Sequence, residues 1–281
     1  MTSFSVRQVR SSDERQLSRW LAMQKKLHTK FSANDLSNWL ATRDGFLAEH
    51  ATEPVGFLLY TETSRENASI ISLAVGDRWD EGEILTILFQ KALPVLRRRE
   101  ISTLTCVTAA KWAGEALRRH LNFNFRGNLA SYLKVDWHVP EFASSAITIR
   151  PASTADGDEI LHIDRAAFPP LWQQDEHAIF TFMQRKGFLL KAEWQEVLVG
   201  YTAGIWKERC GHINRLAVHP QVQGQGIGKR LLAESISHFH QIGIHRITLN
   251  TQVNNTASRQ LYEQFGFQVI NCNIQVLTKA I

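Results

Sequence analysis

Apolar residues in the first half of the chain fall into short strand-like runs, separated by segments in which they recur at helical spacing. The runs predict strands at 5–10, 45–50, 55–61, 69–75 and 102–107. The helical spacing predicts helices at 13–27, 35–41, 83–98 and 112–120. The half ends in alternating apolar positions at Leu129, Tyr132 and Val135. This mixture of elements predicts an α/β (α+β) domain.

The periodicity is lost at 137–146, WHVPEFASSA, which we interpret as a linker because it holds a proline and a run of small residues. A new pattern begins at Ile147. It predicts strands at 147–151, 188–194, 197–206 and 213–218, and helices at 156–167, at 175–186 and from 227 onward. The sequence therefore predicts a second domain of the same class.

A glycine-dense loop, QGQGIG at 223–228, joins the strand at 213–218 to the following helix. A helix N-terminus has free N–H donors and the positive end of the dipole, and glycines let the backbone approach an anion. The spacing is neither that of a Rossmann fingerprint nor that of a P-loop. The pattern indicates an anion site; a tight turn that only eases packing is the alternative.

The two halves show an internal repeat. Leu73-Ala74-Val75 matches Leu216-Ala217-Val218. The apolar positions Ala113, Leu117 and Phe123 likewise match Ala257, Leu261 and Phe267. The shared order of strand, helix, strand, helix and aromatic terminus predicts two similar domains.

The chemistry of the loop is not repeated. The first half has DEGEIL at 80–85 in place of QGQGIG, and three carboxylates there would repel an anion. Arg118 stands where the second half has Tyr262. We interpret the first half as a degenerate copy kept for packing or for shaping the substrate site.

Composition narrows the class of protein. The 281 residues exceed one compact core, so two domains are expected, and 44% apolar with 21% charged residues is typical of a soluble globular protein. A net charge of +5 is too small to indicate a nucleic-acid partner. Neither a membrane span nor a signal peptide is visible. Cys106, Cys210 and Cys272 have no metal spacing, which favours free thiols, a cytoplasmic location and no metal site.

Two motifs together resemble the GCN5-related N-acetyltransferase (GNAT) family. The first is Q-x-x-G-x-G at 223–228 after a strand that ends in Val218. The second is N-x-A-x-x-x-L-Y-E-x-x-G-F at 255–267. The resemblance covers 147–281 strongly and 1–136 weakly. It implies tandem GNAT-like domains, a degenerate one at 1–140 and a catalytic one at 147–281. Each would have a mixed, mostly antiparallel central sheet flanked by helices, with a parallel pair splayed near the glycine loop.

The resemblance also implies an enzyme, an acetyl-CoA-dependent N-acetyltransferase that moves an acetyl group to a primary amine of a small molecule or of a peptide or protein N-terminus. Val218 would polarise the thioester carbonyl through its backbone N–H, and Tyr262 would protonate the leaving thiolate. The residues implied to bind the cosubstrate are Val218, Gln223, Gly224, Gln225, Gly226, Ile227, Gly228, Lys229, Arg230, Asn255 and Ser258. Taken one at a time, four of these residues could instead be ordinary helix residues: Lys229, Arg230, Ser258 and Tyr262.

The sequence identifies neither the general base nor the acceptor. Asn250 stands where some relatives carry a glutamate, so Glu208, His212, a water chain or no base at all remain open. Aromatic and proline side chains could line an acceptor cleft or belong to the core; they are Phe168, Pro169, Pro170, Trp172, Trp194 and Trp206. We expect a monomer or homodimer without nucleic-acid or membrane partners.

Two rival hypotheses stand beside the enzyme. A CoA-binding sensor or scaffold would keep the loop without turnover. An inactive homologue that serves as an interaction protein would not need Gly226, Gly228 and Tyr262, so these residues favour the enzyme over it.

Overall fold

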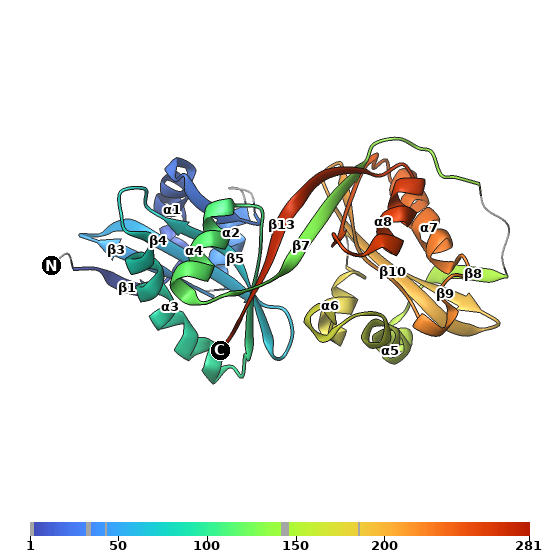
Figure 1. Ribbon diagram of the computed structural model, residues 1–281, viewed down its shortest axis with the longest axis horizontal. Coiled ribbons are helices and arrows are strands. Elements are labelled where there is room, and N and C mark those ends of the chain that lie inside the picture. The colour runs from blue at the N-terminus through green and yellow to red at the C-terminus, as the bar shows by residue number, and fades with distance from the viewer. Residues whose placement is uncertain (1–2, 32–34, 43, 142–145, 185) are drawn as a thin grey trace. The chain divides into compact units, whose positions relative to one another are not determined.

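The computed structural model describes residues 3–31, 35–42, 44–141, 146–184 and 186–281 (Figure 1). The chain packs into two compact units. Unit 1 comprises residues 1–128 and 273–281, and unit 2 comprises residues 129–272.

Unit 1 is built on a sheet with the strand order β1-β3-β4-β5-β6-β13. Neighbouring strands run antiparallel except β5 and β6, which are parallel. The strands are β1 (Ser5–Gln8), β2 (Lys26–Thr29), β3 (Gly45–His50), β4 (Glu53–Glu62), β5 (Asn67–Val75), β6 (Thr103–Thr108) and β13 (Gln268–Ala280). The helices are α1 (Glu14–Met23), α2 (Leu36–Ala41), α3 (Glu81–Arg98) and α4 (Lys111–Leu121).

Unit 2 repeats this arrangement with the order β8-β9-β10-β11-β12-β7, in which only β11 and β12 are parallel. The strands are β7 (Asn124–Lys134), β8 (Ile147–Pro151), β9 (Gly187–Trp194), β10 (Val197–Lys207), β11 (Cys210–Val218) and β12 (Arg246–Gln252). The helices are α5 (Gly157–Ala167), α6 (Glu176–Thr181), α7 (Ile227–Gln241) and α8 (Thr256–Gln264). The two units thus share one strand order, and the predicted repeat and fold class are confirmed.

Helices cover both faces of each sheet because the strands bury side chains on both sides. In unit 1, α3 and α4 cover one face with Leu88 and Leu117, and α1 and α2 cover the other with Leu17 and Leu40. In unit 2, α7 and α8 lie on one face and α5 and α6 on the other (Figure 1). Each unit therefore has three layers.

Each sheet takes its last strand from the other end of the sequence. The C-terminal strand β13 pairs with β6 and buries Leu277 in the core of unit 1, where the chain ends (Figure 1). Residues 129–134 of β7 pair with β12 and bury Tyr132 in unit 2. The packed units therefore do not coincide with the sequence boundaries at 140 and 147. Residues 142–145 of the predicted linker lie outside the described residues.

The parallel pair in unit 2 is splayed. β11 and β12 are paired only from Cys210 opposite Arg246 to Ile213 opposite Leu249. Beyond this point β11 stays paired with β10 as far as Val218, while β12 follows β7 as far as Gln252. The wedge between the diverging strands opens beside the glycine loop, as predicted.

Two predicted helices are shorter than expected. The helix expected at 13–27 ends at Met23, and the strand β2 follows it. The helix expected at 175–186 ends at Thr181; residue 185 lies outside the described residues. β2 pairs with β5, and the described residues of unit 2 form no equivalent strand.

Candidate functional site

The glycine loop presents an uncapped helix N-terminus. Gly224 and Gly226 have φ values of +81° and +79°, and a Cβ at either position would meet nothing within 4 Å. Gly226 is the N-cap of α7, and no side chain caps this end of the helix. Because the first N–H groups of a helix lack intrahelical partners, they are available to an anion.

The backbone of Val218 faces the wedge. His219 N donates to Val199 O at 2.9 Å, and Val218 stands opposite Gly200. Hydrogen-bonded and non-bonded pairs alternate in an antiparallel ladder. Because His219 and Val199 form a bonded pair, the next pair, Val218 and Gly200, is non-bonded, and the N–H and C=O of Val218 point away from β10. The carbonyl accepts a bond from Gln223 Nε2 at 3.1 Å. The N–H therefore points to the edge that β12 has left.

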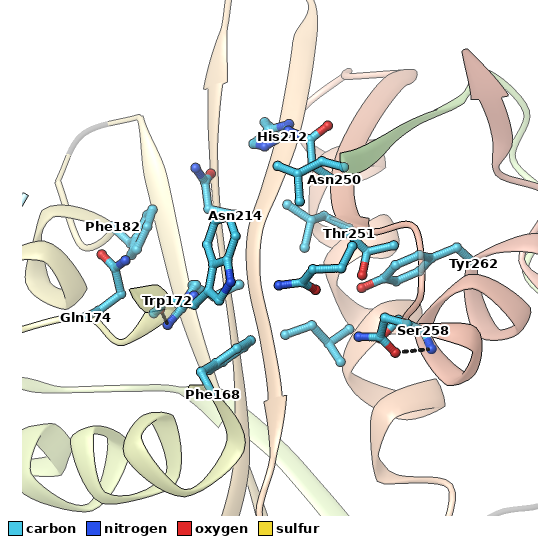
Figure 2. Close-up of a pocket in the computed structure, with 16 residues that line it drawn as sticks. Phe168, Trp172, Gln174, Phe182, His212, Asn214, Asn250, Thr251, Ser258 and Tyr262 are labelled. Carbon is cyan, nitrogen blue, oxygen red and sulfur yellow. Dashed lines mark hydrogen bonds between the residues drawn. The ribbon is translucent and has the colours of Figure 1, made fainter. Parts of the chain in front are cut away.

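A cavity of about 440 Å³ runs from the glycine loop along this open edge. Its wall includes Val218, Gln223, Gly224, Gly228, Asn255 and Ser258. Asn255 is the N-cap of α8, and its Oδ1 accepts a bond from Ser258 N at 3.1 Å (Figure 2). A strand edge, a glycine loop and a capped helix thus enclose one elongated space.

A second cavity of about 310 Å³ adjoins the first and shares Phe168, Leu216, Asn255 and Ser258 with it. Its other lining residues, drawn in Figure 2, are Leu129, Trp172, Gln174, Phe182, His212, Ile213, Asn214, Arg215, Asn250, Thr251, Gln252 and Tyr262. Among the described residues, five side-chain amides and no carboxylate line this second cavity.

Tyr262 projects into the second cavity from α8 (Figure 2). Its side chain is 7% exposed, and burial raises the pKa of its hydroxyl to about 12, an effect that a hydrogen bond with Ser258 partly offsets. Tyr262 is the seventh of the nine residues in α8, so it does not lie at the start of this helix. Helical side chains lean toward the N-terminus, which explains how the hydroxyl reaches Ser258, one turn earlier.

His212 is the candidate base that the structure brings into the second cavity. Burial lowers its pKa to about 4, so the imidazole is neutral at physiological pH. Glu208 is exposed in the turn between β10 and β11 and lines neither cavity. Asn250 does line the cavity but has no proton-accepting nitrogen.

The wall that carries Phe168 and Trp172 is held by a buried ionic network. Asp164, with 0% of its side chain exposed, bonds both Arg215 and the hydroxyl of Tyr201. Arg215 Nη2 also donates to Trp172 O at 2.7 Å, and its guanidinium lies 3.9 Å from the centre of the Phe168 ring. One cation therefore fixes the segment after α5. This network could not be predicted from the sequence, because its members are far apart in the chain.

Replacing Asp164 by asparagine should lower the free energy of unfolding by roughly 3–5 kcal/mol, since it leaves Arg215 buried without its counter-charge. Chemical denaturation would measure the change. Glu159→Gln, on the exposed side of the same helix, is the matched control. Equal losses in the two variants would contradict a structural role for the ion pair.

The predicted cosubstrate residues divide into two groups. Val218, Gln223, Gly224, Ile227, Gly228, Asn255 and Ser258 line the first cavity. The side chains of Gln225, Lys229 and Arg230, and Gly226 itself, do not line it. Among the aromatic residues, Trp194 and Trp206 pack in the core clusters of unit 2 rather than in the acceptor cavity.

The equivalent position in unit 1 is closed. β2 pairs with β5 from Lys26 opposite Val75 to Thr29 opposite Ser72, and so covers the edge that is open in unit 2. The N-terminus of α3 is also occupied, because Asp80 Oδ1 accepts a bond from Glu83 N at 2.8 Å. This end of α3 is therefore capped by a carboxylate and is not available to an anion.

No helix in the described part of the chain is long and apolar enough to cross a membrane. Across the same described ranges, no group of three or more His, Cys, Asp or Glu side chains is arranged to hold a metal ion.

Comparison with known proteins identifies the family. Residues 157–267 match the model of the acetyltransferase (GNAT) family. An uncharacterized N-acetyltransferase of Methanocaldococcus jannaschii is 31% identical over 121 residues, which cover 43% of this chain and 77% of that protein. The chain belongs to the GNAT family. The matched GNAT region contains the glycine loop, Val218 and Tyr262.

Two further comparisons cover more of the chain. A mycothiol acetyltransferase of Streptomyces griseus is 29% identical over 184 residues, or 62% of this chain. The chain spans 59% of that relative and 46% of the mycothiol acetyltransferase of Kocuria rhizophila. A solved tandem GNAT protein from the clavulanic acid biosynthesis pathway aligns with a TM-score of 0.68 and 14% identity, covering 99% of this chain and 98% of that one. This likeness shows the tandem fold.

Proposed function

We propose that the protein is an acetyl-CoA-dependent N-acetyltransferase whose reaction takes place in unit 2. The observation that carries the proposal is the continuity of the two cavities. One joins the uncapped glycine loop to the open edge at Val218, and the other adjoins it and contains Tyr262. A thioester held in the first cavity would present its carbonyl to an amine in the second.

The residues of the first cavity fit an acyl-CoA. The N-terminus of α7 and the two left-handed glycines suit the pyrophosphate, because the backbone donors are free and no side chain fills the space. The open edge of β11 suits the amides of the pantetheine arm. The N–H of Val218 is a fixed donor that would stabilise charge on the thioester oxygen as the amine attacks.

The second cavity favours an acceptor that carries hydroxyl or amide groups near its amine. Its five amides can both donate and accept hydrogen bonds; they are Gln174, Asn214, Asn250, Gln252 and Asn255. No carboxylate lines it to pair with an additional cation, and Arg215 is already paired with Asp164. A hydroxylated small amine or a peptide N-terminus therefore fits better than a polyamine.

The N-terminal unit is proposed to be degenerate, since β2 covers its edge and Asp80 caps its α3. We therefore expect one CoA per chain, bound with the same affinity when Asp80 is changed to alanine. Isothermal titration calorimetry would give the stoichiometry. Two equivalent sites would place a second CoA in unit 1, and a changed affinity of the single site in Asp80→Ala would place that site in unit 1.

The proposal is tested by measuring thiol release from acetyl-CoA with a panel of hydroxylated amines, short peptides and polyamines, beside direct titration with CoA. Release that depends on one of the first two acceptor classes is the expected result. Tight CoA binding without release on any acceptor would favour the sensor or scaffold. The absence of CoA binding would exclude both.

A further inference from the structure

Unit 2 contains a hydrogen-bond relay that the roles assigned so far do not use. His212 on β11 and Thr248 on β12 stand opposite each other in the parallel ladder, one rung before the strands diverge. His212 Nδ1 lies 2.8 Å from Thr248 Oγ1, and Thr248 Oγ1 lies 3.0 Å from Gly211 O. The relay therefore sits at the closed end of the wedge.

The proton positions in this relay follow from the groups themselves. A carbonyl oxygen can only accept, so the single hydroxyl proton of Thr248 is donated to Gly211 O. Its oxygen is then an acceptor toward His212, and Nδ1 must carry the proton of the neutral imidazole. The other ring nitrogen, Nε2, is left with its lone pair.

His212 lines the second cavity together with Asn214 and Asn250 (Figure 2). Side chains two residues apart on a strand share a face, so His212 lies beside Asn214, and Thr248 lies beside Asn250. Among the described residues, the structure gives Nε2 no hydrogen-bond partner. The titratable or charged groups that line this cavity with His212 are Arg215 and Tyr262, and neither accepts a proton at neutral pH.

The geometry points to His212 as the general base of unit 2, held in its Nδ1–H form by Thr248 so that Nε2 faces the acceptor amine. This inference rests on the proposed acetyl transfer. As the amine nitrogen forms its bond to the thioester carbon, one N–H proton passes to Nε2. The C–S bond breaks, and the thiolate takes a proton from Tyr262. Water then returns a proton from the imidazolium to the phenolate.

The burial of His212 determines its strength as a base. Burial lowers the pKa of His212 to about 4, so the ring stays neutral as pH falls until it approaches that value. The base is therefore always available at physiological pH but is weak. It takes the proton only as the attacking nitrogen becomes acidic, and the buried imidazolium gives the proton up readily.

The tautomer can be measured without activity. Long-range ¹H–¹⁵N correlation spectra of protein labelled in histidine report which ring nitrogen carries the proton, and His212→Gln assigns the signal among the 11 histidines. We expect Nδ1–H in the wild type, loss of that preference in Thr248→Val and its return in Thr248→Ser. A wild-type signal with the proton on Nε2 would overturn the inference.

Kinetics test the role in the reaction. His212→Gln should lower kcat by roughly 10²–10⁴-fold, as for a lost general base, with CoA affinity unchanged. Thr248→Val should lower kcat less, and Thr248→Ser should restore it. His238→Gln, which removes a half-buried imidazole that lines neither cavity, is the control and should stay near wild type.

The two levels of the proposal fail in different ways. An active wild type with His212→Gln within a few-fold of it would overturn the base and leave the acetyltransferase standing. A wild type that releases no thiol with any acceptor would overturn the reaction, and the spectra would still support or overturn the Thr248 relay.

Discussion

Replacing Gly226 by valine should weaken CoA binding by about 10²–10⁴-fold. Two effects combine. Valine cannot adopt the φ of +79° without strain, so the turn before α7 must rearrange. The rearrangement withdraws backbone donors from the pyrophosphate, and hydrogen bonds to charged groups are worth roughly 1.5–3 kcal/mol each, of which we expect two to be lost. Titration with CoA measures the loss.

Gly243→Val is the matched control, because Gly243 has nearly the same φ, +77°, with open space around its Cβ position. It lies in the turn after α7 and lines neither cavity. Both variants bear the same backbone strain and should lose similar stability, but only Gly226→Val should lose CoA. Equal CoA affinity in the two variants would show that the pyrophosphate does not bind at the glycine loop.

The sequence was sufficient for features that depend on local pattern. The glycine loop lies between the strand β11 and the helix α7, so the uncapped N-terminus of α7 could be predicted from neighbouring residues. The repeat could be predicted because each unit places the same apolar core, such as Leu216-Ala217-Val218, on the equivalent strand. Both features could be predicted from the spacing of residues within short segments.

Pairings between distant segments could not be predicted from the sequence. Strand β2 was missed, and its first two residues were assigned to a helix, because its four residues are too few to establish a period of two. Its pairing with β5 is nonetheless what closes the edge in unit 1. The exchange of β7 and β13 was equally hidden, since nothing in the residues of either strand indicates which sheet the strand joins.

Side-chain networks were the least predictable part of the candidate site. Arg215 is an ordinary strand residue in the sequence, yet it joins Asp164, Trp172 and Phe168 from a segment more than 40 positions earlier. His212 could be named as a candidate base but not distinguished from a structural histidine. The hydroxyl of Thr248 decides its tautomer, and that contact exists only once β11 and β12 are paired.

Changing Tyr262 to phenylalanine should lower turnover by roughly 10²–10⁴-fold, the range for a lost acid–base group. Burial raises the pKa of the hydroxyl to about 12, so Tyr262 is protonated at every physiological pH and loses its proton only as pH rises toward that value. A free thiol has a pKa of about 8.5, so transfer of the proton from Tyr262 to the free thiolate is uphill by about 5 kcal/mol. The transfer must therefore be coupled to the return of a proton from the His212 imidazolium to the phenolate.

CoA affinity should be nearly unchanged in Tyr262→Phe, because Tyr262 does not line the first cavity and its ring keeps its edge contacts with Tyr132 and Phe267. Tyr132→Phe is the matched control. It removes one oxygen from the same aromatic cluster, but that oxygen accepts a bond from Arg259 Nε at 3.1 Å and Tyr132 does not line the second cavity. Steady-state turnover on an accepted amine distinguishes the two variants. Similar, small losses in both variants would make Tyr262 a packing residue.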